Sequence, residues 1–143
     1  MRRVVATVVL VVHDARALVL RRRPDDRSFA HAWCLPGGGV DADDLSIPQA
    51  ALRETLEETG LPALLVRDLG VHTTALSERQ IVFDIHRFVG RALHDQVRLS
   101  EEHVAHRWLS RRGAAAAHLE LPGGLAGEAT RDLLDRFALG DLP

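Results

Sequence analysis

The stretch LPGGGVDADDLSIPQAALRETLEETGL, residues 35–61, joins a glycine-rich segment to a helix-forming segment. Ser46 stands before the helix-forming run and Gln49 follows three residues later, which is a capping-box pattern for a helix start. Gly60 suits the left-handed conformation in which many helices end. These signals predict a helix over residues 47–59, directly after a loop whose backbone is unusually free.

Three glutamates crowd one face of this predicted helix. At 100° per residue, Glu54, Glu57 and Glu58 fall within a single arc of about 100°. Leu52 and Leu56 project from the opposite side. The pattern therefore predicts that the leucines pack into a core and that the glutamates form one polar face, which in the simplest case is a solvated surface.

A site for a divalent cation is the alternative interpretation of that face. Glu54 and Glu58 form an i,i+4 like-charge pair that destabilises a helix by roughly 0.2–0.5 kcal/mol, and Arg53 offsets only part of this. Converging carboxylate oxygens are the ligands of hard ions such as Mg²⁺ or Mn²⁺. The glycines next to the helix let backbone groups approach a metal or a phosphate, because no Cβ intervenes.

The composition is that of an ordinary globular chain. The 143 residues are 46% hydrophobic and 27% charged with a net charge of −2, which predicts one domain over residues 1–143. Positive charge clusters only at residues 21–23, so we expect neither nucleic acid nor membrane as a partner. Cys34 is the single cysteine, which fits a reducing compartment, and we expect a cytoplasmic protein.

The N-terminal residues superficially resemble a signal peptide, because two arginines precede an apolar run. The run is rich in valine, however, and LVLRRR at residues 18–23 follows as a hairpin partner, so a strand is the better interpretation. The apolar patterns predict strands at 3–13, 17–23, 63–75, 80–91 and 106–110, a connection with at most one helical turn at 111–124, and an amphipathic helix at 125–139.

Residues 38–61 resemble the Nudix box, Gly-x5-Glu-x7-Arg-Glu-U-x-Glu-Glu-x-Gly-U, in which U is a bulky aliphatic residue. Asp44 departs from it by standing where the first glutamate is expected, and eight residues instead of seven separate Asp44 from Arg53. Thr55 takes the first aliphatic position. The resemblance implies an α/β/α sandwich of the Nudix type, with a mixed β-sheet between helices. The matching residues are Gly38, Arg53, Glu54, Glu57, Glu58, Gly60 and Leu61.

The resemblance also implies roles for the box residues. In Nudix enzymes, water attacks a phosphorus of a pyrophosphate in a reaction that depends on Mg²⁺, with Mn²⁺ as the alternative ion. By position, Glu57 and Glu58 are implied metal ligands, and Glu54 is implied to be a ligand or the general base. Arg53 is implied to orient the glutamates through charge-assisted hydrogen bonds, and the Gly37 carbonyl to be a further ligand.

Residues outside the box resemble the family as well. SEEHVAHRWLS, residues 100–110, is similar to a Glu-His-x-x-x-Arg-Trp segment in which Glu102 is implied to bind metal or serve as a base. A surface glutamate is the alternative for Glu102, and a structural or orienting role is expected for His103. The resemblance also implies substrate-binding residues, which are Arg23, Gly38 and Gly39. For Arg23, a solvated side chain is the alternative.

The substrate implied by the resemblance is a small-molecule nucleotide. A nucleoside triphosphate, hydrolysed to a nucleoside monophosphate and pyrophosphate, fits best. The alternative substrates are dinucleoside polyphosphates, ADP-ribose and nucleotide sugars. The alternative to an enzyme is a Nudix module that binds a nucleotide without turnover. Both a monomer and a homodimer are compatible with the sequence.

Overall fold

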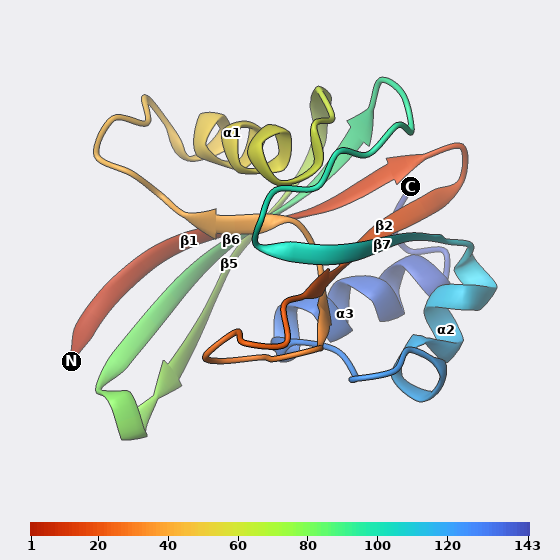
Figure 1. The fold of residues 1–143 in the computed structure, drawn as a ribbon. Coiled ribbons are helices and arrows are strands. Elements are labelled where there is room, and N and C mark those ends of the chain that lie inside the picture. Colours follow the sequence, from red (N-terminus) through yellow and green to blue (C-terminus); the bar gives the residue numbers. More distant parts are fainter.

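A mixed β-sheet of seven strands forms the centre of the computed structural model, which describes residues 1–143. The strands pair in the order β3-β2-β1-β6-β5, with β4 also beside β1 and β7 beside β2. Helix α1 lies on one side of the sheet and helices α2 and α3 lie on the other (Figure 1). The elements are β1 (Arg2–His13), β2 (Arg16–Arg22), β3 (Trp33–Cys34), β4 (Gly37–Gly39), α1 (Ile47–Thr59), β5 (Ala63–Leu76), the short 3-10 helix η1 (Ser77–Arg79), β6 (Ile81–Ala92), β7 (His103–Leu109), α2 (Arg111–Glu120) and α3 (Gly127–Ala138).

Strand β1 makes the sheet mixed. It runs parallel to β6, from the pair Arg2 and Ile81 to the pair Val12 and Arg91, and antiparallel to β2 and β4. A parallel pair needs a long connection, and the chain between β1 and β6 passes through β2, β3, β4, α1 and β5. The strand predicted at 3–13 is confirmed by this pairing, and the predicted sandwich of a mixed sheet between helices is confirmed as well.

The valine- and leucine-rich strands are apolar at successive positions because both faces of the sheet are covered. Successive side chains of a strand point to opposite faces, so neighbours in the sequence enter different cores. On the α1 side, the sheet contributes Val9, Val11, Leu18 and Leu20. On the side of α2 and α3, it contributes Val8, Leu10, Ala17 and Val19. None of the helices has the length and apolar content needed to cross a membrane.

Helix α1 has the predicted ends but a different buried face. Ser46 accepts a hydrogen bond from the Gln49 N–H at 3.2 Å, and Gly60 ends the helix at φ 72°. Leu56, however, is 53% exposed, so its predicted place in the core is wrong. Thr55 takes that place, since its hydroxyl is satisfied by the Ala51 carbonyl at 2.9 Å and its methyl group can enter the core.

Helix α2 is longer than the single turn predicted for this connection. Ser110 caps it by accepting from the Gly113 N–H at 3.0 Å, and Ala114 and Ala117 are buried against the neighbouring core. Small alanines give a weak periodic signal, although they are the best helix formers. The preceding strand, β7, begins three residues before the predicted position 106, because β2 continues to pair with it as far as His103.

Candidate metal centre

Two glycines of strand β4 lie so close to their neighbours, Gly38 to helix α1 and Gly37 to strand β1, that a side chain on either would collide. A Cβ on Gly38 would lie 2.5 Å from the Glu54 Cδ, and one on Gly37 would overlap the Thr7 carbonyl oxygen. The Gly37 N–H donates to the Glu58 Oε1 at 2.8 Å. The glycines therefore hold two of the predicted carboxylates against backbone, which a residue with a side chain would prevent.

The Gly37 carbonyl is free to accept another partner. The Val9 N–H donates to the Pro36 carbonyl at 2.9 Å, so Gly37 occupies the following, non-hydrogen-bonded position of the antiparallel ladder. Peptide groups at such positions point away from the neighbouring strand. This orientation agrees with the predicted use of that carbonyl as a ligand, a role that stays a prediction.

Arg53 organises the first group of carboxylates. Its guanidinium donates to both oxygens of Asp44, at 2.7 and 2.9 Å, and to the Gly39 carbonyl at 3.1 Å. It also donates to Glu54 and Glu57, each at 3.1 Å. These bonds raise the pKa of Arg53 above its ordinary value, with the Asp44 bond the largest cause. Arg53 thus joins the loop to the helix and aligns two glutamates.

Asp44 is occupied by this arrangement. Arg53 binds it side-on, and the Asp41 N–H donates to it at 2.7 Å. The hydrogen bond from Arg53 is the main reason why the pKa of Asp44 lies below its ordinary value. The extra residue between Asp44 and Arg53 therefore leaves the pair intact, and Asp44 acts on the other carboxylates through Arg53.

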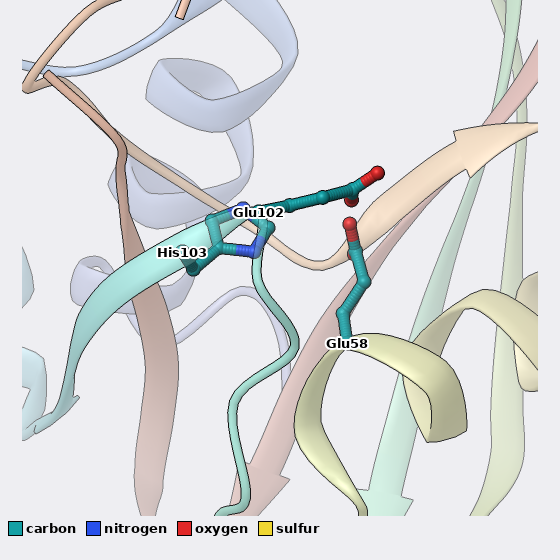
Figure 2. Close-up of side chains that lie close together, drawn as sticks. All are labelled: Glu58, Glu102 and His103. Atoms are coloured by element: carbon teal, nitrogen blue, oxygen red, sulfur yellow. The ribbon is translucent and has the colours of Figure 1, made fainter. Parts of the chain in front are cut away.

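A second group of side chains forms where the segment before β7 crosses the end of α1. The Arg98 N–H donates to the Thr59 carbonyl at 2.7 Å, and the Ser100 N–H donates to the Glu58 carbonyl at 3.3 Å. These backbone bonds bring Glu102 next to Glu58, although they are far apart in the sequence. Figure 2 shows their carboxylate ends facing each other, with the imidazole of His103 beside them. One potential ligand atom from each of the three residues lies within 4.8 Å of the others.

Glu58 is the least ordinary carboxylate of the chain. It is only 5% exposed, and it accepts one hydrogen bond, from Gly37. Its pKa is raised to about 9, chiefly by burial, with the neighbouring Glu102 adding to the rise and the hydrogen bond from the Gly37 amide opposing it. Burial also raises the pKa of Glu54, in spite of Arg53. A bound cation would remove the repulsion that these groups share.

The glutamates of both groups line one hollow of about 350 Å³. Its donor set suits a hard divalent ion, because oxygens predominate and no Lys or Arg side chain lines it. The ring nitrogen Nδ1 of His103, beside Glu58 and Glu102, is buried without a partner, as expected of a group that receives one from outside. The residues therefore fit a metal ion. The lining residues are Glu54, Glu57, Glu58, Ser100, Glu101 and Glu102.

Arg23 stands outside this lining. Its guanidinium donates to Asp25 at 2.9 Å and to the Glu101 carbonyl at 3.2 Å, so it lies next to the rim. No motif in the sequence marks Ser100 or Glu101, and the expected role of His103 is structural or orienting. Glu101 had one signal, its position beside Glu102. His103 had its place in the Glu-His-x-x-x-Arg-Trp segment, but its burial beside Glu58 depends on a distant segment.

Comparisons with known proteins agree with this geometry. The family model described as "NUDIX domain" matches residues 1–128. An uncharacterized Nudix hydrolase, NudL, of Pectobacterium atrosepticum is 39% identical over 71 residues, which are 49% of this chain and 37% of the relative. The chain thus spans little more than a third of the length of that curated relative.

Two solved structures extend the likeness to nearly the whole chain. The MutT protein from Methanosarcina mazei Go1 is 28% identical with a TM-score of 0.77, covering 99% of this chain and 97% of that one. A MutT NUDIX hydrolase from Burkholderia pseudomallei is 27% identical with a TM-score of 0.73, covering 94% and 98%. From the family model, the fold and the glutamate-lined hollow together, we conclude that the chain belongs to the Nudix family.

Proposed function

We propose that this chain is a metal-dependent hydrolase that cleaves the phosphoric anhydride bond of a nucleoside diphosphate linked to another group. The observation that carries the proposal is the hollow lined by five glutamates, one of them the buried Glu58. Bound divalent cations would relieve the repulsion between carboxylates this close together, and a polyphosphate substrate binds divalent cations as well. The solved structure named as a MutT NUDIX hydrolase, 27% identical to this chain, supports hydrolysis as the reaction.

The residues divide the chemistry between them. Glu57, Glu58 and Glu102, with the Gly37 carbonyl, would hold Mg²⁺, with Mn²⁺ as the alternative ion. A divalent ion held by these residues would lower the pKa of a bound water and would neutralise charge that develops on phosphate oxygens. Arg53 keeps Glu57 in place through its hydrogen bond at 3.1 Å.

Glu54 is the proposed general base or an additional ligand. Burial raises its pKa, which makes its carboxylate a better proton acceptor than an exposed glutamate. Arg53 donates to only one of its oxygens in the structure, Oε1, at 3.1 Å, and Oε2 is left for a water or an ion. Glu102 is the second candidate base, because it is exposed at the opposite side of the same hollow.

A nucleoside triphosphate is the proposed substrate, with a nucleoside monophosphate and pyrophosphate as products. Arg23 is proposed to contact a phosphate, since it lies at the rim and can exchange its exposed partner Asp25 for that anion. Gly38 and Gly39 would let the substrate lie close to the backbone. Dinucleoside polyphosphates, ADP-ribose and nucleotide sugars share the same anhydride bond and are the alternatives.

A product-resolved screen tests the proposal. The purified chain is incubated with nucleoside triphosphates, dinucleoside polyphosphates, ADP-ribose and nucleotide sugars, with and without Mg²⁺, and phosphate and pyrophosphate are measured separately. We expect Mg²⁺-dependent pyrophosphate release from a triphosphate, lost in Glu58→Gln and kept in Glu120→Gln, an exposed glutamate of α2. Release from a diphosphate-linked compound alone would shift the substrate class. Nucleotide binding without any turnover would instead identify a binding module.

A further inference from the structure

His103 is the side chain near the hollow whose environment the proposed hydrolysis leaves unexplained. It is only 7% exposed, and its Nδ1 is buried with no hydrogen-bond partner. A histidine buried for packing alone normally has both ring nitrogens satisfied. The unpartnered nitrogen belongs to a ring that offers a ligand atom within 4.8 Å of oxygens of Glu58 and Glu102.

The other side of the ring is held in place by a chain of contacts. Nε2 of His103 lies 3.5 Å from the Cys34 sulfur. Arg22 reaches the same sulfur at 3.9 Å and donates to Asp26 at 3.0 Å. Histidines that bind metals are commonly oriented through the nitrogen that does not bind, and a proton on Nε2 leaves the Nδ1 lone pair free. These contacts occupy Nε2, and they leave Nδ1 without a protein partner on a ring that lies beside both carboxylates.

We propose that His103 Nδ1 is a nitrogen ligand of the metal centre, which raises the affinity of the site for nitrogen-binding transition ions relative to its affinity for Mg²⁺. This inference rests on the proposed metal site at Glu58 and Glu102. Oxygen ligands alone favour Mg²⁺ and Mn²⁺, whereas an added imidazole favours Co²⁺, Ni²⁺ or Zn²⁺. Two carboxylates and one imidazole form such a mixed set, with further positions open to water or substrate.

Electron paramagnetic resonance with Mn²⁺ alone tests the inference without relying on activity. Mn²⁺ is titrated into the full chain, and electron spin echo modulation reports whether a nitrogen is bonded directly to the ion. We expect ¹⁴N modulation in the wild type, its conversion to the ¹⁵N pattern when histidine is ¹⁵N-labelled, and its loss in His103→Gln. His106→Gln, an exposed histidine on the same strand, is the matched control and should keep the modulation.

Metal selectivity gives a second readout. The ratio of Co²⁺ affinity to Mg²⁺ affinity should fall at least about tenfold in His103→Gln and stay unchanged in His106→Gln. Mn²⁺ that binds without nitrogen modulation would overturn the role of His103 and leave the carboxylate site standing. No Mn²⁺ binding at all would overturn both. Absence of the ¹⁵N pattern in the labelled wild type would overturn the role of His103 even if the His103 variant does not fold.

Discussion

The two halves of the carboxylate cluster are neutralised differently. Glu54 and Glu57 receive hydrogen bonds from Arg53, and Glu57 is 57% exposed on its side chain. Glu58 and Glu102 have no arginine, and Glu58 is only 5% exposed. Glu54 and Glu57 are therefore neutralised within the chain by Arg53, whereas Glu58 and Glu102 can be neutralised only by a bound cation or a proton. The difference indicates where a metal contributes most to the stability of the folded protein.

The largest effect is expected from removing one charge in either half. Glu57→Gln and Glu58→Gln should each lower turnover at least about 100-fold, because each removes a proposed metal ligand. Steady-state kinetics with the preferred substrate would measure this, and circular dichroism would verify the fold. Near-normal turnover in a folded variant of either kind would contradict the assignment of the metal site.

The second test compares the acids that flank the helix. Glu102→Gln should lower turnover about 10–100-fold, because Glu102 lines the hollow directly. Asp44→Asn should lower it less, because Asp44 acts through Arg53, which keeps its bonds to Glu54 and Glu57. Parallel kinetics of the two variants decide the matter. The reverse order would mean that the Arg53 half, with Asp44, dominates catalysis.

The pH dependence of stability separates the halves without any substrate. Burial raises the pKa of Glu58 from its ordinary 4.5 to about 9, so between these values the folded chain holds a proton that the unfolded chain has lost. The free energy of unfolding of the metal-free protein should therefore fall as pH rises through this window.

Glu58→Gln should flatten that decline, and Glu57→Gln should leave it as in the wild type. Thermal unfolding in a metal chelator at pH 6 and pH 8.5 measures it, with Glu58→Gln expected to melt higher than the wild type at pH 8.5. A decline of equal size in all three proteins would show that the buried carboxylate is not its source.

The smallest effect is expected at Leu56, which lies between Glu54 and Glu58 in the helix but faces solvent. Leu56→Gln should change the free energy of unfolding by about 0.5 kcal/mol or less and leave turnover unchanged. Chemical denaturation with parallel kinetics measures both. A loss of several kcal/mol would mean that this side chain is buried after all, and that the glutamates form one exposed face as the sequence pattern predicts.

The parts of the fold that the sequence predicted are those decided by local signals. Ser46 and Gly60 mark the ends of α1 because capping is settled within a few residues. Runs of valine and leucine marked β1 and β2 because strand patterning is local as well. The alanine-rich α2 was missed, since its burial depends on packing against α3 and leaves little trace in its own pattern.

The candidate site was predictable in its residues more than in its arrangement. The glutamates of α1 stand out through their spacing, and Glu102 through its resemblance to a family segment. The burial of Glu58 was not predictable, because it depends on residues 98–102 crossing the helix end. The unpartnered nitrogen of His103 has the same origin, since its neighbours come from β3 and α1.

The pair formed by Asp44 and Arg53 has a consequence for recognising related chains. The guanidinium reaches the aspartate even though one additional residue separates the two in the sequence. A surface loop accommodates the additional residue, so the contact forms although the spacing differs from that of the motif. A sequence search that requires the fixed spacing would reject this chain. A structural search for an acid hydrogen-bonded to the arginine of this helix would accept it, together with relatives whose loops differ more in length.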